Sequence, residues 1–182
     1  MPLHQQETDY SCGPASLLAV LRYWGAFKGK ERDLYGPLET SKKDGTEPPK
    51  LRDFARSLGL SAELRTGMTL ADLRAALGRG ETVIVDIQAW RENPHSTKPW
   101  KDDWEDGHYV VVIGMDAKDV FFEDPVLKDS YAYMPADELL SRWHDYEDRH
   151  GTVQRYWQAG VVIRGRSPAP APLPTKKPVR LD

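Results

Sequence analysis

The sequence predicts an α+β domain in which N-terminal helices pack on an antiparallel β-sheet. Helical patterns fill the first part of the chain and strand patterns dominate the second, which is the order typical of this class. The chain has 182 residues, the length of a single domain that buries roughly 70% of its unfolded surface and needs no disulfide or metal to fold. A short turn over residues 114–119 joins two of the strands, so these two are expected to be antiparallel.

The first helix is expected from Pro14 to Trp24, because apolar residues recur there at helical spacing. Proline suits the first turn of a helix, and Gly25 provides the stop. Thr69 and Asp72 form a capping-box pattern at the start of a later helix. The further helices are expected over residues 50–58, 69–78 and 135–143.

Strands are expected over residues 82–87, 109–113, 120–122 and 153–163, which are rich in apolar and β-branched residues. Residues 91–107 are polar and contain two prolines, which predicts a long loop. Three tryptophans (Trp90, Trp100 and Trp104) and four acids (Asp102, Asp103, Glu105 and Asp106) lie in or beside it. These residues suggest that the loop forms one wall of a substrate-binding site suited to a cationic or flexible peptide. The alternative is an ordinary surface loop.

The chain divides into a domain over residues 1–166 and a flexible C-terminal tail over residues 167–182. The tail, SPAPAPLPTKKPVRLD, holds five of the 14 prolines of the chain. Proline lacks the N–H that helices and sheets require, so the tail is expected to be extended and mobile. Its removal is expected to leave the fold and the activity intact.

The composition excludes several classes of protein. Lysine and arginine total 25 while aspartate and glutamate total 28, so the formal net charge is −3. This balance argues against nucleic acid or an anionic membrane as the main partner. No apolar run approaches the ~20 residues that span a bilayer, and the first residues lack the pattern of a signal peptide. The expectation is a cytoplasmic protein.

Cys12 is the single cysteine, which rules out a disulfide within these 182 residues and metal sites built from several of their thiolates. It stands at the start of the first helix, in the polar string DYSCGP. Unpaired amide groups and the helix dipole stabilise a thiolate at such a position. Cys12 is therefore the candidate nucleophile, and a small buried apolar residue is the alternative.

Five histidines compete for the role of base. His108 is the best placed, because it begins the strongly apolar strand in GHYVVVIG. The others are expected in poorer positions, with His95, His144 and His150 exposed to solvent and His4 in a disordered N-terminus.

Asp124 is the candidate partner of His108. Pairing the two residues across an antiparallel hairpin puts the midpoint at residue 116, inside the expected turn. Paired side chains share a face of the sheet, so the carboxylate would orient the ring. Pro125 then ends the strand. A slip of one residue would turn Asp124 to the other face.

A thiolate that attacks a carbonyl also needs hydrogen-bond donors for the oxyanion. The N–H of Cys12 can supply one bond and the side-chain amide of a nearby glutamine another. Gln6 and Gln5 both precede Cys12 closely, and their spacing alone does not choose between them.

Together these residues resemble the motif of the peptidase C39-like family of papain-like cysteine peptidases. The strings that carry the resemblance are QETDYSCGPASL, DGHYVVVIG and FFEDP. The resemblance implies a papain-like fold with Cys12 as nucleophile, His108 as base, Asp124 as orienting acid and Gln6 rather than Gln5 as oxyanion donor. The best-known members are N-terminal domains of transporters that cut leader peptides after a double glycine. This chain shows no apolar segment of membrane length and no Walker motif, so their substrate is not carried over.

The predicted function is a cysteine peptidase, or thiol hydrolase, that cleaves a peptide or amide bond without a cofactor or metal. A peptide or protein substrate is the expected partner. An acyl transferase of the phytochelatin synthase-like type, using the same triad, is one alternative, and a peptide-binding module with a degenerate site is the other. A metal site built from Cys12, His108 and Asp124 is disfavoured, because no two of them are closely spaced in the chain.

Overall fold

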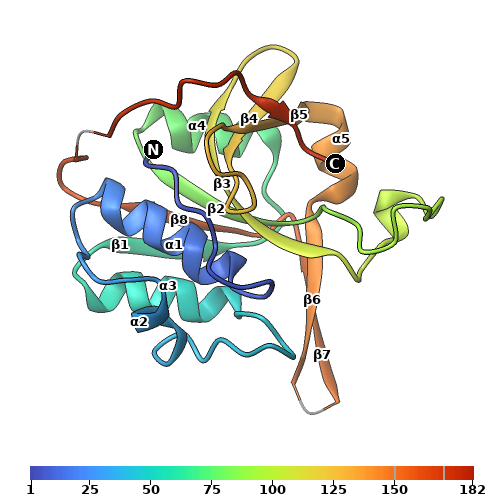
Figure 1. Cartoon of the computed structure of the whole chain (residues 1–182), viewed down its shortest axis with the longest axis horizontal. Coiled ribbons are helices and arrows are strands. Elements are labelled where there is room, and N and C mark those ends of the chain that lie inside the picture. Colours follow the sequence, from blue (N-terminus) through green and yellow to red (C-terminus); the bar gives the residue numbers. More distant parts are fainter. Residues whose placement is uncertain (150, 170) are drawn as a thin grey trace.

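The computed structural model describes residues 1–149, 151–169 and 171–182. Seven strands form one sheet in the order β1-β8-β2-β3-β4-β5-β9, and β6 pairs with β7 in a separate hairpin (Figure 1). All neighbouring strands are antiparallel except β5 and β9, which are parallel. The predicted α+β class with a largely antiparallel sheet is confirmed.

The helices are α1 (Cys12–Tyr23), α2 (Arg32–Tyr35), α3 (Pro48–Ser57), α4 (Leu70–Gly78) and α5 (Ala136–Arg142), with a short 3₁₀ turn η1 (Trp100–Asp102). All four predicted helices are present, and only α2 was not expected. Thr69 and Asp72 form the expected capping box at α4. Two prolines begin α3, two residues before the predicted start, because proline is tolerated in the first turn of a helix.

The strands are β1 (Ser61–Arg65), β2 (Thr82–Gln88), β3 (Gly107–Met115), β4 (Asp119–Glu123), β5 (Ala132–Pro135), β6 (His144–Arg149), β7 (Thr152–Trp157), β8 (Gly160–Arg164) and β9 (Val179–Arg180). The single strand predicted over residues 153–163 is wrong, because Gln158 adopts a positive φ of 48° and divides β7 from β8. Strands β1, β5, β6 and β9 were not predicted. β1 and β6 carry several charged residues, and β5 and β9 are short, so all four lack a clear apolar run.

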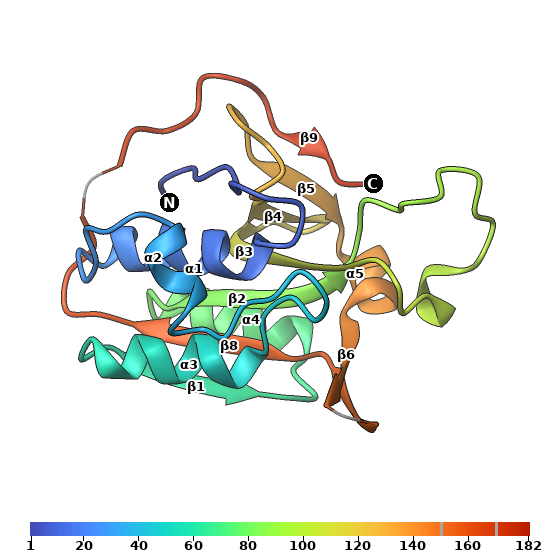
Figure 2. The same ribbon diagram turned by 60° about the horizontal axis from the view of Figure 1, so that its bottom comes forward.

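Each face of the sheet has its own apolar core, because alternate residues of a strand point to opposite faces. Val83, Val85 and Val110 pack with α4 and α5, whereas Ile84 and Val111 pack with α1, α2 and α3. Figure 2 shows α1 and α2 above strands β2, β8 and β1 in that view. No described helix is long and apolar enough to cross a membrane.

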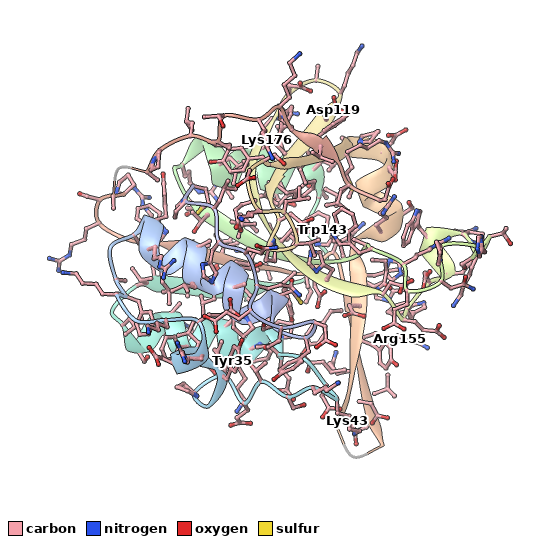
Figure 3. The ribbon with its side chains drawn as sticks, viewed as in Figure 1. Tyr35, Lys43, Asp119, Trp143, Arg155 and Lys176 are labelled. Carbon is pink, nitrogen blue, oxygen red and sulfur yellow. The ribbon has the colours of Figure 1, made fainter. Side chains whose placement is uncertain are left out.

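The end of the chain is part of the fold, which corrects the prediction that residues 167–182 form a mobile tail. Val179 and Arg180 form β9 beside β5, and Leu181 is 0% exposed in the core on the α4 and α5 face. Lys176, labelled in Figure 3, forms an ion pair with Asp129 at 2.9 Å. Prolines end at residue 178, so the last four residues keep their N–H groups for a strand.

We therefore expect Leu181→Ala to lower the free energy of unfolding by about 2–5 kcal/mol, the usual cost of truncating a buried leucine. Leu173→Ala is the control, because Leu173 lies in the same segment and is 76% exposed. Urea denaturation of both variants measures the effect. Equal stability of the two variants would show that β9 is not docked in solution.

Candidate active site

Cys12 is the first residue of α1, and no side chain caps the start of this helix. Ser11 occupies the cap position but makes no side-chain capping bond, because its hydroxyl pairs with the backbone of Thr8. Pro14 has no N–H, so Cys12 and Gly13 carry the first free amides of the helix. A Cβ atom at Gly13 would lie 2.8 Å from the Cβ of Thr46, so only glycine fits there.

His108 and Asp124 lie side by side in the structure. Nε2 of His108 is 2.9 Å from Oδ1 of Asp124, and both side chains are almost fully buried. Burial by itself lowers the pKa of His108. The charge and hydrogen bond of Asp124, followed by those of Cys12, outweigh it and raise the pKa to about 10. The ring is therefore an imidazolium at neutral pH.

The contact arises through a different register from the one predicted. Val111 lies opposite Glu123, which places Asp124 beside Val110 rather than His108. The midpoint at residue 116 is therefore wrong by one residue. A β-bulge between Val112 and Gly114 explains why the contact still forms. The register at the turn, continued without the bulge, would put Asp124 on the opposite face from His108.

The sequence suggested Trp90 as part of a wall beside a substrate, but its contact with Asp124 was not predicted. Its indole Nε1 donates to Oδ2 of Asp124 at 3.0 Å, while the backbone N–H of Val126 donates to Oδ1 at 2.9 Å. Asp124 thus accepts from His108, Trp90 and Val126 together. The backbone N–H of Trp90 also donates to the carbonyl of Asp182, the last residue of the chain. The C-terminal segment therefore helps to position Trp90, and Trp90 in turn positions Asp124. The proximity of Trp90 to the end of β2 was the available signal.

The N-terminal segment is ordered by a buried carboxylate, which corrects the prediction that His4 lies in a disordered terminus. Nε2 of His4 is 2.8 Å from Oε2 of Glu31, and the hydroxyl of Tyr35 donates to Oε1 at 2.7 Å. Burial raises the pKa of Glu31, but hydrogen bonds from His4, Ser11, Tyr35 and the N–H of Glu7 outweigh it and lower the pKa. No sequence pattern marked Glu31.

Gln6 lies in this ordered segment. Its backbone N–H donates to the carbonyl of Pro125, next to Asp124, at 2.9 Å. Its side-chain Nε2 donates to the carbonyl of Thr8 at 2.7 Å, which uses one of its two N–H groups. Gln5 is exposed.

Two further histidines, His95 and His144, hydrogen-bond to groups other than His108 and Asp124. His95 is exposed, as predicted. His144 is 1% exposed, so the prediction of solvent exposure is wrong; its Nε2 donates to the carbonyl of Asp103 at 2.7 Å, and its ring packs on Trp104 and Trp157. Burial lowers its pKa. His150 lies outside the described residues.

A cleft of about 640 Å³ opens beside Cys12. Its lining includes Asp86 and Tyr109 from the sheet, Trp104 from the long loop and Asp145 from β6. Trp100 is not part of this lining, because its ring lies between the guanidinium groups of Arg91 and Arg142. No group of three or more His, Cys, Asp or Glu side chains among the described residues is arranged to hold a metal ion.

Comparisons with known proteins agree on the class that this fold defines. The sequence profile of the Peptidase_C39 like family matches residues 1–151, so the chain belongs to that family. No protein among the curated sequences matches the chain.

Solved structures of C39 peptidases share the fold. A C39-like peptidase candidate from Bacillus anthracis is 18% identical, with a TM-score of 0.65 over 91% of this chain and 95% of that one. The peptidase domain of Streptococcus ComA, a bifunctional ABC transporter of a quorum-sensing pathway, is 19% identical, with a TM-score of 0.63 over 91% and 98%. A double-glycine-motif protease from an AMS/PCAT transporter, in complex with its leader peptide, is 19% identical, with a TM-score of 0.59 over 91% of each chain.

The charge on His108 predicts how fast Cys12 reacts. We expect His108→Ala to slow the alkylation of Cys12 by iodoacetamide at pH 7 on the order of tenfold, because the imidazolium that favours the thiolate is lost. His95→Ala, which removes an exposed histidine, should label at the wild-type rate. Mass spectrometry measures the rates, and Cys12 is the only thiol. Identical rates for the two variants would contradict an effect of the His108 charge on the reactivity of Cys12.

Proposed function

We propose that this protein is a cysteine peptidase that hydrolyses a peptide bond with the thiolate of Cys12. The observation that carries the proposal is the buried His108–Asp124 pair, whose ring interacts with Cys12 at the start of α1. Since Nε2 of His108 is held by Asp124, Nδ1 is the ring nitrogen left to face the sulfur. Membership of the Peptidase_C39 like family supports the same activity.

In the proposed reaction, the Cys12 thiolate attacks the carbonyl carbon, and His108 gives its proton to the leaving amine as the C–N bond breaks. Water then attacks the acyl-enzyme, with His108 as the base, and releases the acid. The N–H of Cys12 and the free N–H of the Gln6 amide hold the oxyanion. Asp124 positions the ring and favours its protonated form, and Trp90 positions Asp124.

The test is to incubate the protein with a defined peptide mixture in H₂¹⁸O and to analyse the products by mass spectrometry. A hydrolase yields new C-termini that carry ¹⁸O, and an acyl transferase yields a new amide with an added amine. The Cys12→Ala chain is the control. Absence of any new terminus, together with peptide binding, would favour a binding module instead.

The oxyanion assignment predicts that Gln6→Ala lowers kcat by about 10²–10³, the usual cost of losing one such donor. Gln5→Ala is the matched control, because Gln5 precedes Gln6 directly and its side chain is exposed. Peptide turnover measures both, with circular dichroism as the check of folding. If Gln5→Ala lowered kcat strongly while Gln6→Ala kept the wild-type kcat, Gln5 rather than Gln6 would be the oxyanion donor.

A further inference from the structure

The cleft beside Cys12 has an unusual balance of charge. Nine of its described lining residues are acids and two, Lys42 and Lys43, are bases. The imidazolium of His108 is a third positive charge, close enough to Asp86 to act on the pKa of that residue. The excess of carboxylates favours a positively charged ligand.

Asp86 is the deepest of these acids and has a buried oxygen with no partner. It lies in the middle of the apolar strand β2, opposite Tyr109, and is 6% exposed. Its Oδ1 is buried and has no hydrogen-bond partner among the described residues. A buried carboxylate oxygen without a donor is costly, so such an atom in a cleft wall is suited to a donor that arrives with a ligand.

Asp145, on β6, is held against Asp86. Its Oδ1 accepts a hydrogen bond from Nε2 of Gln88 at 3.2 Å, and its carboxyl group lies close enough to that of Asp86 for their charges to interact. A Cβ atom at Gly107 would lie 2.1 Å from Oδ2 of Asp145, so the space that glycine leaves open is filled by this carboxylate. Burial, followed by the charge of Asp145, raises the pKa of Asp86, and burial raises the pKa of Asp145 to about 6. A cation placed between the two would relieve this cost.

The walls of the cleft suit an organic cation. Trp104 lines it, and the guanidinium of Arg155 lies 5.2 Å from its ring, within the range of a cation–π contact. A guanidinium or ammonium group on a flexible aliphatic stem combines an N–H donor for Oδ1 of Asp86 with an apolar part suited to the aromatic wall at Trp104.

We propose that Asp86 and Asp145 form a specificity subsite for the side chain of an arginine or lysine in the peptide substrate, next to the bond that Cys12 attacks. This proposal rests on the proposed function, since it assigns the substrate of the same site. It predicts that Asp86 and Asp145 select the substrate through charge and are not needed to activate Cys12.

The first test compares matched peptides. A set with arginine or lysine at each position around the scissile bond is compared with the same peptides carrying citrulline or acetyl-lysine, which keep the shape and lose the charge. We expect kcat/KM to favour the cationic peptides by about ten- to a hundredfold at one position, as for other charge-assisted hydrogen bonds. Asp145→Asn and Asp86→Asn should each reduce this ratio at least fivefold. Glu92→Gln, an exposed acid outside the cleft, should leave it unchanged.

The second test does not need peptidase activity. Cys12 is treated with the cationic reagent 2-(trimethylammonium)ethyl methanethiosulfonate and with neutral methyl methanethiosulfonate, and the ratio of the two rates is compared with the ratio for the chain unfolded in urea. We expect the folded chain to favour the cationic reagent about tenfold more, and Asp86→Asn and Asp145→Asn to remove most of this preference. The neutral reagent corrects for any change in the reactivity of the thiol.

The outcomes separate the two proposals. Cleavage of neutral and cationic peptides at equal rates, unaffected by either variant, would overturn the subsite and leave the peptidase standing. A charge-dependent reagent ratio with no cleavage of any peptide would support a cation site and overturn the peptidase. A reagent ratio equal to that of the unfolded chain would overturn the subsite.

Discussion

Cys12→Ala and His108→Ala are each expected to abolish nearly all peptide hydrolysis, with kcat reduced by roughly 10⁴–10⁶. The reason is that the thiolate and the imidazolium act as one unit: without the sulfur no acyl-enzyme forms, and without the ring the leaving amine receives no proton. The double variant should therefore be little slower than either single variant. Turnover of one peptide substrate by the four chains measures this directly.

The control for this cycle is His95→Ala, which removes an exposed histidine from the long loop and should retain wild-type turnover. Circular dichroism of every variant separates lost chemistry from lost fold. If the losses in the two single variants multiplied in the double variant, Cys12 and His108 would be acting independently, and the proposed mechanism would be wrong.

Asp124→Asn should lower kcat by about 10²–10⁴, and Trp90→Phe should restore part of the loss. Three donors surround the carboxylate, from His108 and Val126 at Oδ1 and from Trp90 at Oδ2. The side-chain NH₂ group of an asparagine would lie against at least one of these donors. Two N–H groups would then oppose each other, and one hydrogen bond would be lost. Removal of the indole N–H lets the amide settle with its oxygen toward His108.

The measurement is kcat for Asp124→Asn, Trp90→Phe and the double variant. Trp90→Phe alone should be modestly slower than wild type, because Asp124 loses one hydrogen bond, whereas in the asparagine background it should raise kcat about tenfold. A double variant slower than Asp124→Asn would show that the indole does not act through this carboxylate.

The four predicted helices and the His108–Asp124 contact follow from local patterns that a sequence displays. Apolar spacing and a capping box are short-range signals, and they located α1 and α4 within two residues of their observed starts. The contact was predicted through the wrong register, because a β-bulge depends on packing along the whole strand pair and has no local signature here.

The contacts that were missed are those between residues far apart in the chain. Glu31 organises the N-terminal segment from 27 residues away, and Trp90 reaches Asp124 across 34 residues. Leu181 is buried although its segment is rich in proline. The prediction of a mobile tail used the composition of the whole segment, and the last four residues, which contain no proline, differ from the rest. Asp86 did carry a signal: an acid inside an apolar strand is expected to be buried for a reason.

Strand β8 has a consequence for how this chain folds. It is among the last strands to be synthesised, yet it lies between β1 and β2 in the sheet, and these two strands do not pair with each other. Until residues 160–164 are synthesised, the edges of β1 and β2 that β8 later covers have open backbone groups. Pairing between strands so far apart in the sequence is slow, because the chain loses conformational entropy on closing the loop before the stabilising contacts form. Chains truncated before β8 are therefore expected to aggregate rather than to fold. Chaperones that bind exposed strand edges should raise the yield of the folded, full-length chain.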